Sequence, residues 1–169
     1  PLEEPLLPLI ASLADIGEGE LGLLQVLFEQ TRHPWDQNLL RAVTTPSGKP
    51  FFADAPEVTA HAKEKVSSPL FAAVLRIGGW SQDPDRASEI VSRVAAGLSQ
   101  FGSSQSNELM PLPNDDLETL ESDLLERSTH RSGMLLSAEE LLSFVQPPGS
   151  GVRVAELWRA RERMKAAPA

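Results

Sequence analysis

The sequence predicts an α+β fold, in which helices pack on a mixed sheet of about three to four strands. Two apolar segments, residues 21–30 and 70–77, have the length and composition of strands that are buried on both faces. Residues 83–101 carry the clearest helical pattern, a single apolar stripe along one side. The two strands are joined by a helical stretch long enough for a parallel crossover.

The elements around the first strand follow from local signals. Apolar residues at helical spacing predict a helix over residues 2–16, which Gly17 and Gly19 would end. Residues 35–43 fit a short helix after the break at 33–34. Asp54 is the expected N-cap of a helix over 54–66, with a proline in its first turn.

The second half of the chain begins where Gly78 and Gly79 are expected to end the second strand. Asp83 should cap the 83–101 helix, with Pro84 at the first helical position. Residues 108–112 suggest a short edge strand, because Pro111 cannot lie in a central ladder.

Three helices and one short extended piece are expected after it. Residues 114–127 predict a very acidic helix, and 134–136 an extended segment. Ser137 and Glu140 form a capping box for a helix over 138–145. A last helix with alternating charges is expected over 154–165.

Composition narrows the class of protein. The chain has 169 residues, no cysteine and a net charge of -9, which fits one acidic globular domain and excludes disulfides and thiolate metal sites. The charge is uneven, at +3 over 151–169 and therefore -12 over 1–150. An acidic body repels phosphates, so we expect no general nucleic-acid-binding role.

The chain is expected to divide into an accessory domain, residues 1–150, and a basic helix with a linker, residues 151–169. It begins with Pro1 and ends in a linker-like KAAPA, both of which favour an excised piece of a longer protein. A candidate interaction surface lies on the basic helix, with docking to a following domain and a solvated connector equally favoured. Its residues are Arg153, Arg159, Arg161, Arg163 and Lys165.

Motifs with known chemistry are weak in this sequence, so we predict no catalytic residue, metal ligand or cofactor. Residues 46–50 (PSGKP) lack the first glycine and the metal-binding hydroxyl of a phosphate loop. His61 and Glu64 are three residues apart on a predicted helix, but a di-metal site needs a matching pair from another helix. His130, next to Ser128 and Thr129, has no nucleophile elbow nearby.

Two charged features have a structural and a functional interpretation. The acidic residues of 115–126 favour a solvated helix face over a cation site or a surface for a basic partner. Arg76 lies inside an apolar strand, where an unpaired guanidinium is costly, so it should lie near a strand end or find a carboxylate. Structural pairing is favoured over catalysis for Arg76.

Several segments in order resemble one protein family: residues 19–35, 67–77, 83–101, 106–112 and 130–148, the last containing MLLSAEELLSFVQPP. Together they resemble the region just before the motor domain of conjugative type IV secretion ATPases and related HerA/FtsK-like transfer proteins. The resemblance implies a non-catalytic accessory domain of a cytoplasmic transfer ATPase, free or at the inner face of the membrane. Walker motifs and an arginine finger are not recognisable in the chain, and would lie beyond Ala169.

The partners implied by the resemblance are the motor domain of the same chain, neighbouring subunits and secretion-channel proteins, with no membrane span. Two alternatives remain open. One is a small enzyme with a site built from Asp, Glu, Arg and His residues, for which Arg76 and an acid are the best candidates. The other is a DNA-contacting module that uses the basic helix over 153–165.

Overall fold

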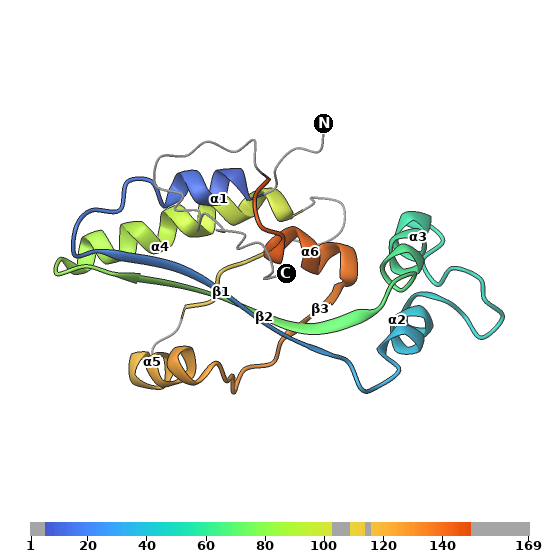
Figure 1. Ribbon diagram of the computed structural model, residues 1–169. Coiled ribbons are helices and arrows are strands. Elements are labelled where there is room, and N and C mark those ends of the chain that lie inside the picture. The colour runs from blue at the N-terminus through green and yellow to red at the C-terminus, as the bar shows by residue number, and fades with distance from the viewer. Residues whose placement is uncertain (1–5, 103–108, 114–115, 150–169) are drawn as a thin grey trace, which may run out of the picture.

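The computed structural model describes residues 6–102, 109–113 and 116–149, and confirms an α+β fold with helices packed on a sheet (Figure 1). In chain order the elements are α1 (Leu7–Ser12), β1 (Leu21–Gln30), α2 (Trp35–Val43), α3 (Pro56–Lys65), β2 (Leu70–Trp80), α4 (Pro84–Leu98), a short 3-10 turn (Ser99–Phe101), α5 (Leu117–Glu126), β3 (Met134–Ser137) and α6 (Ala138–Val145).

The described strands form one antiparallel sheet in the order β1-β2-β3. Leu21 lies opposite Trp80, and Gln30 lies opposite Phe71, so β1 and β2 pair along the whole length of β1. The expected parallel crossover, and with it the mixed sheet, is therefore wrong for these strands. The physical reason is visible in Figure 1: α2 and α3 turn back on each other at one end of the sheet, and β2 returns from the end at which β1 left.

The main core lies between one face of the sheet and the layer formed by α1, α4 and α6 (Figure 1). Val94 of α4 is fully buried in it, and the other members come from all three helices and from β2 and β3. They are Leu9, Ala73, Leu98, Leu136, Leu141 and Phe144. The apolar stripe of α4 predicted this packing, because its residues recur at the spacing of one helix face.

The start of α4 agrees with the sequence. Asp83 is the N-cap, its carboxylate accepts the N–H of Asp85 at 3.0 Å, and Pro84 follows at the first helical position. Gly79 then lets the strand approach this helix closely, since a Cβ there would stand 2.7 Å from the carbonyl oxygen of Ala87. Gly78 and Gly79 therefore continue β2 to Trp80 and do not end it as expected.

Several other boundaries differ from expectation. Among the described residues α1 begins only at Leu7, and Ala55 takes the N-cap position of α3 that was expected for Asp54. Residues 109–113 are not a strand, while residue 108 lies outside the described part. Strand β1 is half-buried along its middle and exposed at both ends, so the expectation that it is buried on both faces is wrong. The reason is that helices cover only one of its faces along most of its length (Figure 1).

The capping box of α6 is present as predicted. The Ser137 hydroxyl accepts the N–H of Glu140, and the Glu140 carboxylate accepts the N–H of Ser137. The same carboxylate binds the Lys65 ammonium at 2.8 Å, which ties the end of α3 to the start of α6. At its other end the α2–α3 pair is held by the Thr59 hydroxyl, which donates to the carbonyl of Val43 at 3.2 Å.

Candidate functional site

Arg76 lies in the middle of β2 on the face of the sheet opposite α4, and only 9% of it is exposed. Gln25 of β1 lies directly opposite Arg76, so the two side chains are neighbours on the same face of the sheet. Helix α5 covers this part of the face (Figure 1). The sequence predicts that Arg76 lies near a strand end or finds a carboxylate, and the second outcome is the one observed, since Asp123 of α5 supplies a carboxylate at 3.3 Å.

The guanidinium of Arg76 is held by four acceptors. One terminal nitrogen donates to the Gln25 side-chain oxygen and to the Asp123 carbonyl, each at 3.1 Å. The other donates to the Asp123 carboxylate and to the carbonyl of Ser128. Gln25 completes the contact by donating its amide to the carbonyl of Leu124 at 3.1 Å. We call Arg76, Gln25, Asp123 and Ser128 the Arg76 cluster.

The Asp123 carboxylate has two further neighbours. The Ser128 hydroxyl donates to it at 3.2 Å, and the Nε2 of His130 lies 3.4 Å away. His130 itself is largely exposed, whereas Asp123 is buried. Of the three residues 128–130 singled out in the sequence, Ser128 and His130 therefore contact Asp123, a carboxylate that also pairs with Arg76.

The arrangement is that of a joint between α5 and the sheet. At the C-terminal end of α5, Arg127 adopts a left-handed conformation at φ 55°, and the carbonyl of Asp123 accepts the backbone N–H groups of Arg127 and Ser128. A cation there is favoured by the helix dipole, and Arg76 donates to this carbonyl, to that of Ser128 and to the Asp123 carboxylate. The guanidinium is buried, and both of its terminal nitrogens already donate hydrogen bonds. These hydrogen bonds hold α5 in place.

A second charged cluster lies on the α4 side of the sheet, at the end where β1 begins. Arg86 of α4 grips both carboxylate oxygens of Glu20, at 2.9 and 3.0 Å. This bidentate contact, with the N–H of Gly17 and the Ser81 side chain as further donors, lowers the pKa of Glu20 to about 2. Glu89, held by Arg86 and Arg93, also has a lowered pKa.

A groove of about 360 Å³ lies between α3 and the start of α6. His61 and Glu64 line one side, and Glu139 and Glu140 line the other. Lys65 also lines the groove and pairs with Glu140, so one of the four acidic and imidazole groups already has a cation. Across the described residues, no three His, Asp or Glu side chains come close enough together to hold a metal ion.

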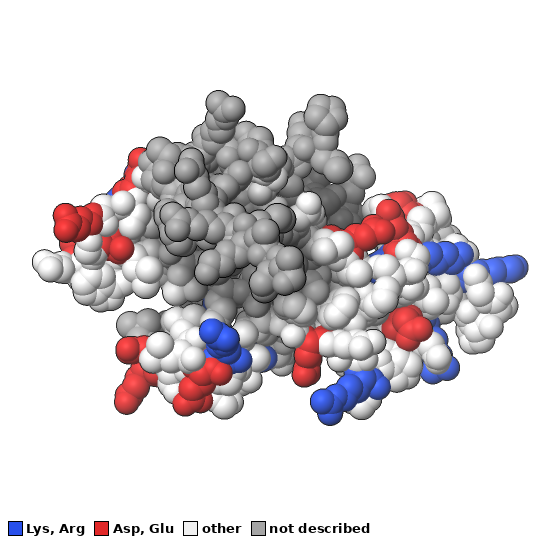
Figure 2. Space-filling view, in the orientation of Figure 1, with Lys and Arg blue, Asp and Glu red and all other residues white. Residues whose placement is uncertain are grey.

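The remaining predicted residues have simple positions. Residues 46–50 form an exposed turn in which Gly48 has a φ of 78°, a conformation that suits glycine. The basic residues Arg153, Arg159, Arg161, Arg163 and Lys165 lie outside the described residues, as does the helix expected over 154–165. Where the surface is described, acidic and basic side chains are interspersed on the face shown in Figure 2. None of the described helices combines the length and apolar character that crossing a bilayer requires.

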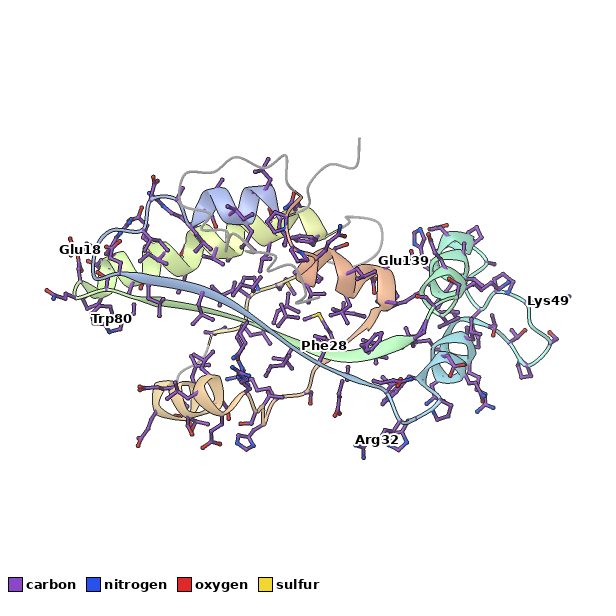
Figure 3. All side chains as sticks on the ribbon, in the orientation of Figure 1. Glu18, Phe28, Arg32, Lys49, Trp80 and Glu139 are labelled. Atoms are coloured by element: carbon purple, nitrogen blue, oxygen red, sulfur yellow. The ribbon has the colours of Figure 1, made fainter. Side chains whose placement is uncertain are left out.

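The surface feature that sequence reasoning missed is a set of exposed apolar side chains. Trp80 and Leu21 are directly opposite each other, and both are 54% exposed. The strand register places both side chains on the α5 side of the sheet, and Figure 3 shows Trp80 at the end of the sheet, beyond α5. Leu23 continues this row and leans over Gly78. We call Leu21, Leu23 and Trp80 the Trp80 patch. The sequence signal for this patch is that β1 carries apolar residues on both of its faces. At this end of the strand, helices cover only one of the two faces (Figure 1).

Other aromatic side chains are also at the surface. Phe28, Trp35, Phe51 and Phe52 are exposed, whereas Phe71, Phe101 and Phe144 are at least partly buried. Large exposed apolar residues that gather in one place are typical of surfaces that contact other molecules.

No protein-family model, curated protein or solved structure matches this chain.

Proposed function

We propose that this chain is a non-catalytic interaction domain of a transfer ATPase of the conjugative type IV secretion class, acting in the cytoplasm or at the inner face of the membrane. The observation that carries the proposal is the Trp80 patch, an apolar and aromatic surface at the free end of the sheet. Trp and other aromatic residues are enriched where proteins contact each other. The order of segments from residue 19 to 148 supports the choice of ATPase class.

The internal use of the charged residues favours a binding role over an enzymatic one. Arg76 and Asp123, the pair with the best claim to a buried reactive site, satisfy each other and the end of α5. Glu20 and Arg86 do the same at the other face. The charged side chains at these two places therefore serve to fix helices, while Leu21 and Trp80 are exposed on the surface.

The partner in this proposal is the motor domain of the same polypeptide, with neighbouring subunits and channel proteins as further contacts. The test is a titration of the isolated motor domain with this chain, followed by calorimetry. Binding should be saturable, and Trp80→Ser should weaken it about tenfold or more, since buried tryptophans are frequent binding hot spots. Phe51→Ser, which removes another exposed aromatic side chain, between α2 and α3, is the matched control.

Three results would contradict the proposal. One is a parent polypeptide that contains no phosphate-loop motor domain. Another is a titration in which this chain does not bind the motor domain. The third is ATP hydrolysis by this chain alone that persists through purification and is lost in an Arg76 variant that still folds.

A further inference from the structure

Strand β1 is an outer strand of the sheet, and its free edge is unusually open. It runs for 10 residues and pairs only with β2 among the described elements. Its pairing is continuous from Leu21 to Gln30, without a bulge. Natural edge strands are usually short, bulged, or marked by Lys or Pro, which prevents a second strand from adding to them. The only charged residue in β1 is Glu29.

The hydrogen-bonding direction of each residue of β1 can be read from the pairing. The N–H of Thr31 donates to the carbonyl of Leu70, the next pair after Gln30 and Phe71. Hydrogen-bonded and non-hydrogen-bonded pairs alternate in an antiparallel ladder. Odd-numbered residues of β1 therefore turn their N–H and C=O groups towards β2. The even-numbered residues turn theirs outward, and these are Gly22, Leu24, Val26, Phe28 and Gln30.

We propose that a second copy of this chain covers this edge, by antiparallel pairing of β1 with β1 about a two-fold axis at Val26. In that register all the outward-facing residues meet one another: Val26 meets Val26, Leu24 meets Phe28, and Gly22 meets Gln30. Every outward N–H and C=O then has a partner. The result is one sheet that runs through both copies, and the inference does not rest on the proposed function.

The side chains fit this register. Even-numbered residues point to the α4 side, where Phe28 is 52% exposed and makes an edge-on contact with Phe71. Pairing would place Leu24 of the second copy directly beside Phe28, and such aromatic–aliphatic cross-strand pairs stabilise a sheet. On the other side, Glu29 would face Leu23 of the partner, so the two Glu29 carboxylates would lie at opposite ends of the contact.

Charge at the two ends of β1 favours a second copy in antiparallel orientation. Glu18 lies just before the strand and Arg32 just after it, both are exposed, and Figure 3 shows them at opposite ends of the strand. An antiparallel copy brings Glu18 of one chain to the end that carries Arg32 of the other, twice by symmetry. A parallel copy would instead bring like charges together. A two-fold contact also closes on itself and leaves no free β1 edge for a third copy.

The test uses the intact chain and measures its mass by sedimentation over a wide range of concentrations. We expect a monomer–dimer equilibrium. Phe28→Lys should shift it to monomer, because it sets a charge against Leu24 of the partner. Phe51→Lys changes an exposed phenylalanine outside β1, between α2 and α3, and should leave the dimer intact. Circular dichroism of each variant checks that the fold is kept.

A charge-reversal cycle gives an independent test with exposed residues only. Glu18→Arg and Arg32→Glu should each weaken the dimer about tenfold, since two opposite-charge contacts become two like-charge contacts. The double variant should restore the wild-type dissociation constant, which a loss of folding would not do. Hydrogen exchange adds a positional readout: on dilution the amides of Leu24, Val26 and Phe28 should lose protection, while those of Leu23 and Leu27 keep it.

The proposal is overturned by a chain that stays monomeric up to its solubility limit. It is equally overturned by a dimer that persists unchanged in Phe28→Lys and in both charge reversals, or by exchange protection that does not alternate along β1.

Discussion

The two faces of the sheet are covered by different means. On one side α1, α4 and α6 bury a continuous apolar core, with Val94 fully enclosed. On the other side α5 is fixed by the polar Arg76 cluster, and the Trp80 patch beyond it stays exposed. The first arrangement gains its stability from burial of apolar surface, which many residues share. The second depends on a few directed contacts, so it can be lost without losing the fold.

The comparison is sharpest for a core residue of α4. Leu98→Ala removes a buried side chain from the main core and should lower the free energy of unfolding by about 2–5 kcal/mol, because a cavity remains. Chemical denaturation measures this loss, and near-UV circular dichroism checks the packing. Leu125→Ala on α5 is the matched control, since Leu125 is largely exposed and its loss should cost less than about 0.5 kcal/mol. Equal losses of unfolding free energy in the two variants would contradict the claim that the α4 side of the sheet supplies most of the stability.

The Arg76 cluster should respond locally. Asp123→Ala leaves the guanidinium without its carboxylate, and we expect α5 to come off the sheet so that Arg76 regains water. The cost should be about 1–3 kcal/mol, which is the range for an unsatisfied buried polar group. Hydrogen exchange should show faster exchange for the amides of α5, with those of β2 unchanged.

Two variants control that experiment. Glu121→Ala removes an exposed carboxylate from the same helix and should leave exchange in α5 as it was, apart from small effects of charge. The double variant Arg76→Met with Asp123→Leu should recover most of the lost stability, because an apolar pair can replace a buried ion pair. Uniformly faster exchange across the sheet in Asp123→Ala would mean that the cluster supports the whole fold.

The difference between the faces also explains what the sequence could and could not predict. Helices α4 and α6 and the capping box at Ser137 depend on local patterns, and the sequence predicts them close to their observed bounds. Helix α1 is an exception, because it ends at Ser12 and not at residue 16 as expected. An unpaired buried guanidinium is costly, so Arg76 is expected near a strand end or beside a carboxylate, and Asp123 is that carboxylate. The partner itself could not be identified, since it lies 47 residues away and depends on where α5 docks.

Strand direction and exposure were beyond local patterns. The direction of β2 depends on how α2 and α3 fold back on each other, and helical spacing gives no information about that turn. The exposure of Trp80 has a similar origin, because apolar residues on both faces of β1 predict burial, whereas α5 covers only part of the second face and leaves this end exposed. Gly79 reads as a strand end in the sequence, yet the close approach of α4 is what requires a glycine there.

The smallest expected effect concerns the pH dependence of the Glu20–Arg86 pair. The ion pair lowers the pKa of Glu20 to about 2, from the ordinary value of 4.5. A lowered pKa in the folded state contributes stability that is fully present above the ordinary value and is lost as the pH falls through about 2. Glu20→Gln should therefore be less stable than wild type at pH 6, and the difference should shrink between pH 4.5 and pH 2.

Thermal unfolding of both proteins across this pH range measures the difference between their transition temperatures. Glu57→Gln, an exposed carboxylate on α3, is the control for the change of net charge. Because Glu20 joins α4 to the turn before β1, the effect should vanish when Arg86→Met already removes its partner. A Glu20→Gln effect of equal size at pH 6 and pH 2, or one that persists in Arg86→Met, would show that Glu20 acts through packing at this end of the sheet and not through its charge.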